Sequence, residues 1–124
     1  MGELKRDAGA ASRFRARAEA VIAEDSLDGV REIAREIALE APDREWAQSC
    51  LIQLSRHRDA EVRGNALEGF GHLARRFGRL DPGRVRRIVA IALVDPSAMV
   101  REKARSAALD LRTFLRWEFE DAQP

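Results

Sequence analysis

The sequence has one cysteine, no tyrosine and only four prolines among its 124 residues. A lone cysteine, Cys50, cannot form an internal disulfide, so we expect a reducing compartment such as the cytoplasm. No run of about 18 apolar residues occurs, which argues against a membrane-spanning helix and a membrane partner. No apolar segment lies near the N-terminus either, so no secretory signal is expected.

The chain also lacks the residue patterns of common catalytic and metal-binding sites. Its two histidines, His57 and His72, and Cys50 do not have the spacing of a zinc site. Phosphate-binding glycine loops, nucleophile elbows and zinc-protease motifs are missing. We therefore expect a protein without enzymatic activity, catalytic residues, metal, cofactor or small-molecule substrate.

The charge balance gives no overall attraction to nucleic acid, because the net charge is only +1. Hydrophobic residues make up 45% of the chain and charged residues 35%, which suits one globular or helical-repeat domain. Arginine outnumbers lysine 20 to 2. We attribute this bias to base composition wherever the arginines do not cluster.

A short pattern, Val-Arg-x-x-Ala, occurs three times, at 30–34, 62–66 and 100–104. Each copy follows an acidic segment typical of a helix start, and another helix-period apolar segment precedes it. No segment alternates with period two, so the sequence predicts an all-α fold of three antiparallel helix pairs. The predicted helices are 12–23 and 27–40, 43–55 and 60–76, and 82–94 and 97–117. These helices form one domain, 12–117, between a flexible N-terminus, 1–11, and an acidic tail, 118–124.

Local signals mark several helix ends. Asp81 followed by Pro82 predicts an N-cap with proline in the first turn, and Asp95 followed by Pro96 repeats the pattern. Gly78 stands where a left-handed residue ends a helix. In 85–94, Ile91 and Val94 lie outside the broad apolar face, which predicts a helix packed on more than one side.

The three copies resemble the second helices of the HEAT-repeat family, which open with an acidic residue, then Val-Arg, then alanine three positions later. The resemblance covers 12–117 and implies an α-solenoid. It also implies a ladder of ion pairs between adjacent units. The ladder residues are Asp25, Arg31, Asp59, Arg63, Asp95 and Arg101. Two departures are that the middle aspartate stands four residues before its arginine instead of six, and that the first unit has fewer large apolar residues.

Three glycines lie within one predicted helix. Gly69 falls on the inward stripe, where a small residue lets a neighbouring helix approach. Gly64 and Gly71 fall on the opposite side, and we expect them to be exposed beside a polar strip. The strip consists of Asn65, Glu68, His72 and Arg75, and Lys103 and Asp110 extend it onto the next unit. We predict that these six residues form a partner-binding surface; the alternative is a plain solvated face.

A second candidate site is the basic segment 75–87, which contains one acidic residue, Asp81. A helix–loop–helix corner of this kind can bind phosphates, although only Phe77 is available among the arginines for base stacking. The alternative is a solvated corner. The candidate anion-binding residues are Arg76, Arg79, Arg84, Arg86 and Arg87. Farther along, Trp117 is expected to cap the end of the array, or else to be an exposed binding residue.

The chain also resembles small stand-alone bacterial HEAT-like proteins, some of which neutralise a cognate toxin. This resemblance implies a non-enzymatic protein-binding module that occludes a partner protein, such as a toxin domain, as an immunity-type inhibitor. Two alternatives stay open. One is a nucleic-acid or anion-binding module that uses the 75–87 corner, and the other is a scaffold subunit of a larger complex.

Overall fold

The computed structural model describes residues 2–119, with side chains from residue 8 onward. The described residues form helices and no strand, which confirms the all-α prediction. The helices are α1 (Gly2–Glu24), α2 (Leu27–Glu40), α3 (Arg44–Leu54), α4 (Ala60–Phe77), α5 (Pro82–Ala92) and α6 (Ala98–Leu115). Every helix except α1 begins and ends within two residues of its predicted bounds. No helix in this part of the chain is both long enough and apolar enough to cross a bilayer.

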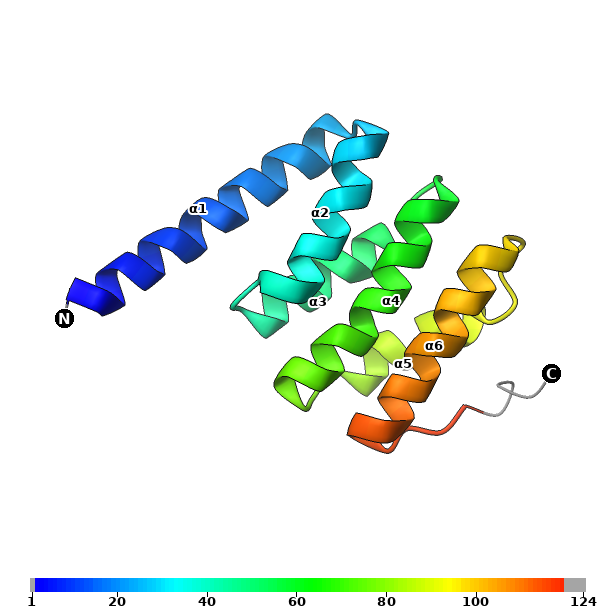
Figure 1. Cartoon of the computed structure of the whole chain (residues 1–124). Coiled ribbons are helices and arrows are strands. Elements are labelled where there is room, and N and C mark those ends of the chain that lie inside the picture. The colour runs from blue at the N-terminus through cyan, green and yellow to red at the C-terminus, as the bar shows by residue number, and fades with distance from the viewer. Residues whose placement is uncertain (1, 120–124) are drawn as a thin grey trace.

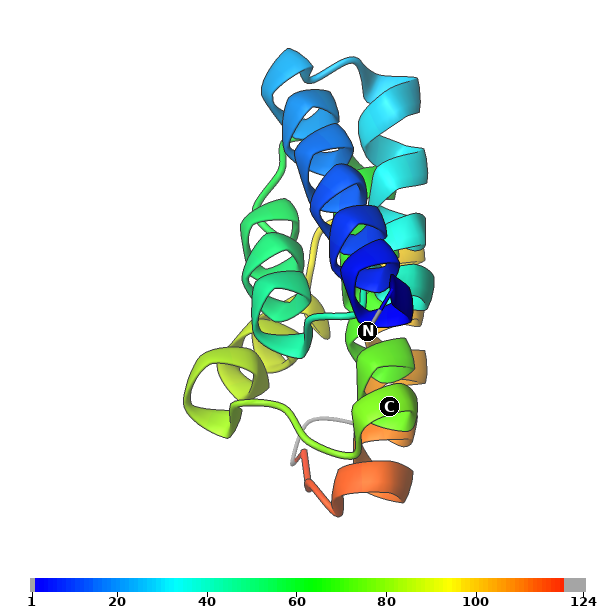
Figure 2. The same cartoon turned by 90° about the vertical axis from the view of Figure 1, so that its left-hand side faces the viewer.

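The helices form two layers (Figures 1 and 2). Helices α2, α4 and α6 lie side by side and run in the same direction, while α3 and α5 run back behind them. Helix α1 lies at the N-terminal end of the array. Each helix therefore runs antiparallel to the next one in the chain, and three helix pairs stack in one array.

Helix α1 begins at Gly2, ten residues before its predicted start at 12. The segment expected to be flexible, 1–11, is therefore helical from residue 2, and its alanines are strong helix formers. The later part of α1 packs against its neighbours. Ala18 is fully buried, and the ring of Phe14 meets that of Trp46 edge to face with centroids 6.1 Å apart.

Two of the predicted helix ends are confirmed and one is wrong. Asp81 caps α5 by accepting a hydrogen bond from the Gly83 backbone N–H at 3.0 Å, and Gly78 ends α4 with φ 69°. Asp95 is not the cap of α6. Ser97 takes that position, because the Asp95 carboxylate is bound to the Ser97 N–H and to Arg63.

The core is built around α4. The largest buried side chains include Phe70 and Leu73 of this helix, both with no exposed area. Cys50 is buried as well. Burial raises the pKa of its thiol to about 11, so Cys50 stays protonated and packs as a small apolar residue.

The glycines of α4 mark close helix contacts. A Cβ at Gly69 would lie 2.7 Å from Leu51 Cδ1 and 3.1 Å from the Ala38 Cβ, which confirms the predicted contact. The expectation that Gly64 and Gly71 are exposed is wrong, since both are buried against α6. The expectation assumed that α4 buries one face only. In the structure α4 contacts α2, α3, α5 and α6, so several of its sides are buried.

Replacing Gly69 by alanine is expected to destabilise the protein by about 1–3 kcal/mol through overpacking. This loss should exceed the gain in helix propensity, which is about 1 kcal/mol. Urea unfolding measures the change. Gly9→Ala is the matched control, because its Cβ would meet only the flexible end of Arg13. A Gly69→Ala variant as stable as Gly9→Ala would contradict the close contact.

Candidate functional site

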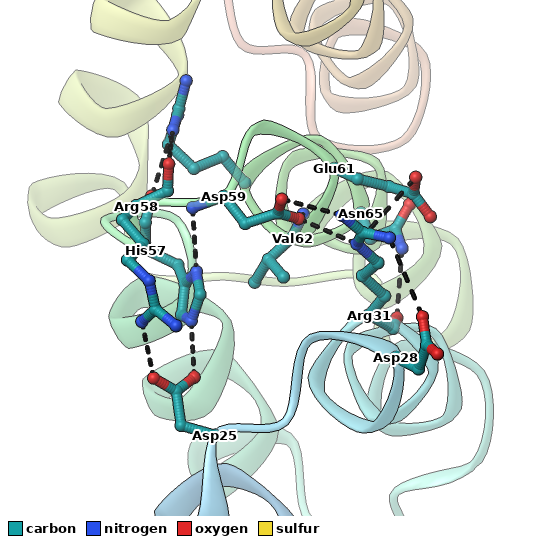
Figure 3. A network of polar contacts seen from close by, with 10 residues as sticks. Asp25, Asp28, Arg31, His57, Arg58, Asp59, Glu61, Val62 and Asn65 are labelled. Carbon is teal, nitrogen blue, oxygen red and sulfur yellow. Dashed lines mark hydrogen bonds and ion pairs between the residues drawn. The ribbon is translucent and has the colours of Figure 1, made fainter.

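Bidentate ion pairs join the adjacent helix pairs. Arg31 donates from Nε and Nη2 to the Asp59 carboxylate, both at 2.9 Å (Figure 3). Arg63 makes the same pair of bonds to Asp95, both at 3.1 Å. Asp59 also caps α4 by accepting from the Val62 backbone N–H. Four of the six predicted ladder residues are therefore paired across the two junctions.

The two remaining ladder residues have other partners. Asp25 accepts hydrogen bonds from His57 Nε2 and Arg58 Nη1, both at 2.6 Å (Figure 3). Because the Asp59 backbone N–H donates to His57 Nδ1, the ring proton lies on Nε2 and is given to Asp25. Asp25 thus ties the α1–α2 turn to the α3–α4 turn of the second helix pair.

Arg101 is held in the same way as Arg63. Its Nη1 donates to the Asp95 and Pro96 carbonyls at 2.7 and 3.1 Å. Arg63 Nη1 donates to the two carbonyls at the equivalent positions before its own helix, at 3.1 and 3.0 Å. Within the described residues, however, no carboxylate forms an ion pair with Arg101.

These contacts shift the titration of the ladder carboxylates. The hydrogen bonds from Arg31 lower the pKa of Asp59 to about 2. Arg58, and then His57, lower the pKa of Asp25. Burial alone would raise the pKa of Asp95, but the bonds from Arg63 and the Ser97 N–H outweigh it, and the pKa is lowered. All three carboxylates are therefore ionised at neutral pH and serve to hold the array together.

The predicted polar strip lies on α4, and much of it is used inside the array. Asn65 is buried and donates from Nδ2 to the Arg31 carbonyl at 3.0 Å, which links α4 to α2. Glu68 accepts from Lys103 Nζ at 2.7 Å, which links α4 to α6. These contacts occupy the groups that a partner would have to bind.

The other end of the strip is occupied in a similar way. Arg75 Nη2 lies 3.8 Å from the Asp110 carboxylate, which also packs against Gly71. His72 is half-buried beside a small hollow between α2 and α4. The structure thus brings the six predicted partner-binding residues together at the helix junctions, with three of them hydrogen-bonded there.

The arginines of the predicted anion-binding corner lie in different environments. Arg76 donates to the Ala38 and Ala41 carbonyls at 2.8 and 2.7 Å, which binds the end of α2. Arg86 stacks on the ring of Trp117, 5.3 Å from its centroid. Arg79 is exposed, and Arg84 and Arg87 line a groove on the other layer. Trp117 is itself buried, as expected for a capping residue.

The groove lies between α3 and α5 and encloses about 620 Å³. We call it the α3–α5 groove. Its apolar lining is Ile52, Leu67, Ile88, Ile91 and Ala92, and its polar lining includes Arg56, Arg84, Arg87, Ser55 and Asp95. Leu67 of α4 is buried and forms the base. The groove exists because α4 packs closely on α2 and α6, whereas α3 and α5 meet at only a few positions.

Two large apolar side chains are uncovered at the C-terminal end of α5 and just beyond it. The sequence predicts that Ile91 and Val94 are packed, yet their side chains are 59% and 72% exposed. The three arginines of the groove are also exposed, and none has a carboxylate within ion-pair distance in the described part of the chain. Asp95 offers no free carboxylate, since Arg63 and the Ser97 N–H bind it.

Sequence reasoning missed Arg56, which lies outside the 75–87 segment and joins Arg84 and Arg87 only through the fold. Among the described side chains, no three histidine, cysteine or acidic residues gather closely enough to hold a metal ion. Comparisons with known protein families, curated proteins and solved structures gave no significant match.

Replacing Arg63 by methionine is expected to lower the free energy of unfolding by about 1–3 kcal/mol more than replacing Arg101. Each variant loses two equivalent carbonyl contacts, but only Arg63→Met leaves a largely buried carboxylate, Asp95, without its bidentate partner. Urea denaturation of the two variants checks this difference. Equal losses would contradict an energetic role for the ion pair.

The lowered pKa of Asp59 predicts a pH-dependent contribution to stability. That contribution is fully present above the unfolded-state pKa, about 3.9, and is lost as the pH falls towards 2. Urea unfolding of the unmodified protein and of Arg31→Met between about pH 6 and 2 should therefore converge at the acidic end. A stability difference that does not change with pH would contradict this linkage.

Proposed function

We propose that the protein is a non-enzymatic, HEAT-like module that binds another protein in the α3–α5 groove. The observation that carries this proposal is the exposed Ile91 side chain of α5, in a cavity with an apolar base and exposed arginines. Apolar residues and arginine are enriched in the centres of protein interfaces. A stacked array keeps such a surface preformed, so little ordering entropy is lost on binding.

The groove fits this function better than the strip on α4. The strip's charges already pair across the α4–α6 junction, as Glu68 does with Lys103. A partner would have to break such pairs and replace them. Binding in the groove breaks no internal ion pair of its arginines.

The form of protein binding that we favour is occlusion of a partner's active surface, with a toxin domain as one such partner. This choice rests on the resemblance to small HEAT-like proteins. We place the function in the cytoplasm, where Cys50 would stay reduced.

Binding of nucleic acid is the second candidate, and the exposed arginines Arg56, Arg79, Arg84 and Arg87 favour it. The aromatic residues near these arginines argue against nucleic-acid binding. Phe77 is covered by Arg76, 4.7 Å from its centroid, and Trp117 is buried. Stacking of bases would need a free ring. Phosphate binding would also weaken steeply with added salt, whereas binding over an apolar base would keep a salt-independent part.

A photo-crosslinking residue at position 91, introduced in the native host, is expected to capture one discrete protein. The same residue at Leu39 of α2, which is 50% exposed and lies outside the groove, is the matched control. Mass spectrometry of the adducts distinguishes the two positions. Identical adducts at both positions, or nucleic-acid adducts alone at position 91, would contradict the proposal.

A further inference from the structure

The α3–α5 groove has the length of a short helix. Along α5, its lining side chains include Arg84, Arg87, Ile88 and Ile91, at spacings of three, one and three residues. These positions share one side of α5 and, with Ala92 where the helix ends, span about 12 Å at 1.5 Å per residue. A partner segment of about two helical turns would match this length.

The groove has apolar residues at its centre and cations on both walls. Ile52, Leu67 and Ala92 are nearly buried at its base, and Ile91 stands exposed above them. Arg56 lies on the α3 side, just past the end of that helix, while Arg84 and Arg87 lie on α5. A complementary segment therefore needs an apolar stripe with carboxylates along its flanks, because arginine binds carboxylates with two parallel hydrogen bonds.

The walls of the groove also select the conformation of the occupant. α3 and α5 are helices, and their interior backbone groups bond within each helix. A peptide that pairs as a β-strand needs an open strand edge, and the described residues contain no strand. A polyproline-type peptide needs a groove lined by aromatic rings, and none of the residues that line this groove is aromatic. A helix satisfies its own backbone groups and needs only side-chain contacts.

We propose that the α3–α5 groove binds an amphipathic, acidic helix of a partner protein. Apolar side chains of this helix, spaced i, i+3 or i+4, and i+7, insert over Leu67 and Ile91. Carboxylates on its two flanks pair with Arg56 on one side and with Arg84 and Arg87 on the other. This inference rests on the proposed protein-binding function and names the kind of segment that the groove takes.

A displayed library of 14-residue peptides tests the proposal directly. Each peptide carries leucine at helical spacing on one face and randomised residues on the flanks. Selection on the full chain is expected to enrich aspartate and glutamate at the flanks. A selected peptide should bind at least tenfold more tightly than a shuffled peptide of the same composition. Enrichment of basic or neutral flanks, or no preference over the shuffled peptide, would overturn the proposal.

Substitutions inside and outside the groove test where a selected peptide binds. Ile91→Asp should weaken a selected peptide at least tenfold, and Leu39→Asp should leave its affinity unchanged; both side chains are exposed, and circular dichroism checks that both variants fold. Arg84→Glu combined with Arg87→Glu should reverse the preference towards a peptide with lysine flanks. An affinity that none of these groove substitutions changes would overturn the assignment to this surface.

The outcomes also separate this inference from the proposed function. If position 91 crosslinks to a protein but the library shows no enrichment for acidic helices, the helix assignment fails and the binding function stands. If a single-stranded DNA of 20 nucleotides binds more tightly than every selected peptide and displaces it, both fail in favour of nucleic-acid binding.

Discussion

Close packing around α4 fixes the rest of the array, since this helix contacts α2, α3, α5 and α6. Gly69 lets Leu51 and Ala38 reach its backbone, and Gly64 and Gly71 let α6 do the same on another side. Protein interiors are packed almost without voids, so a methyl group at Gly69 would displace Leu51 and Ala38, and one at Gly64 or Gly71 would displace side chains of α6. The three glycines therefore help to set the spacing of the layer formed by α2, α4 and α6.

That spacing brings Arg31 and Arg63 within reach of the next aspartate along the array. Asp59 has two roles, because its carboxylate caps α4 and accepts both hydrogen bonds from Arg31. The start of one helix is thereby coupled to the helix of the preceding pair. Asp95 combines similar roles at the next junction, binding Arg63 and the Ser97 N–H, although Ser97 takes over the cap. The junctions and the helix starts thus depend on the same few carboxylates.

Local sequence signals predicted the helices well, because caps such as Asp81 and stops such as Gly78 act within one turn. The Val-Arg-x-x-Ala pattern likewise placed Arg31 and Arg63 at equivalent positions. The surroundings of Gly71 could not be predicted, since they depend on where a third helix lies. The α3–α5 groove was hidden for the same reason. It arises from the divergence of two helices, and Arg56 joins it from a distant part of the sequence.

The ladder also has a direction, because every junction offers a guanidinium from the earlier unit and a carboxylate from the later one. A second copy stacked head to tail would have to present Asp25 to Arg101. His57 and Arg58 already hold Asp25, so this carboxylate is satisfied within its own chain. Extending the ladder through Asp25 would therefore compete with contacts inside the chain, which disfavours this route to open-ended filaments.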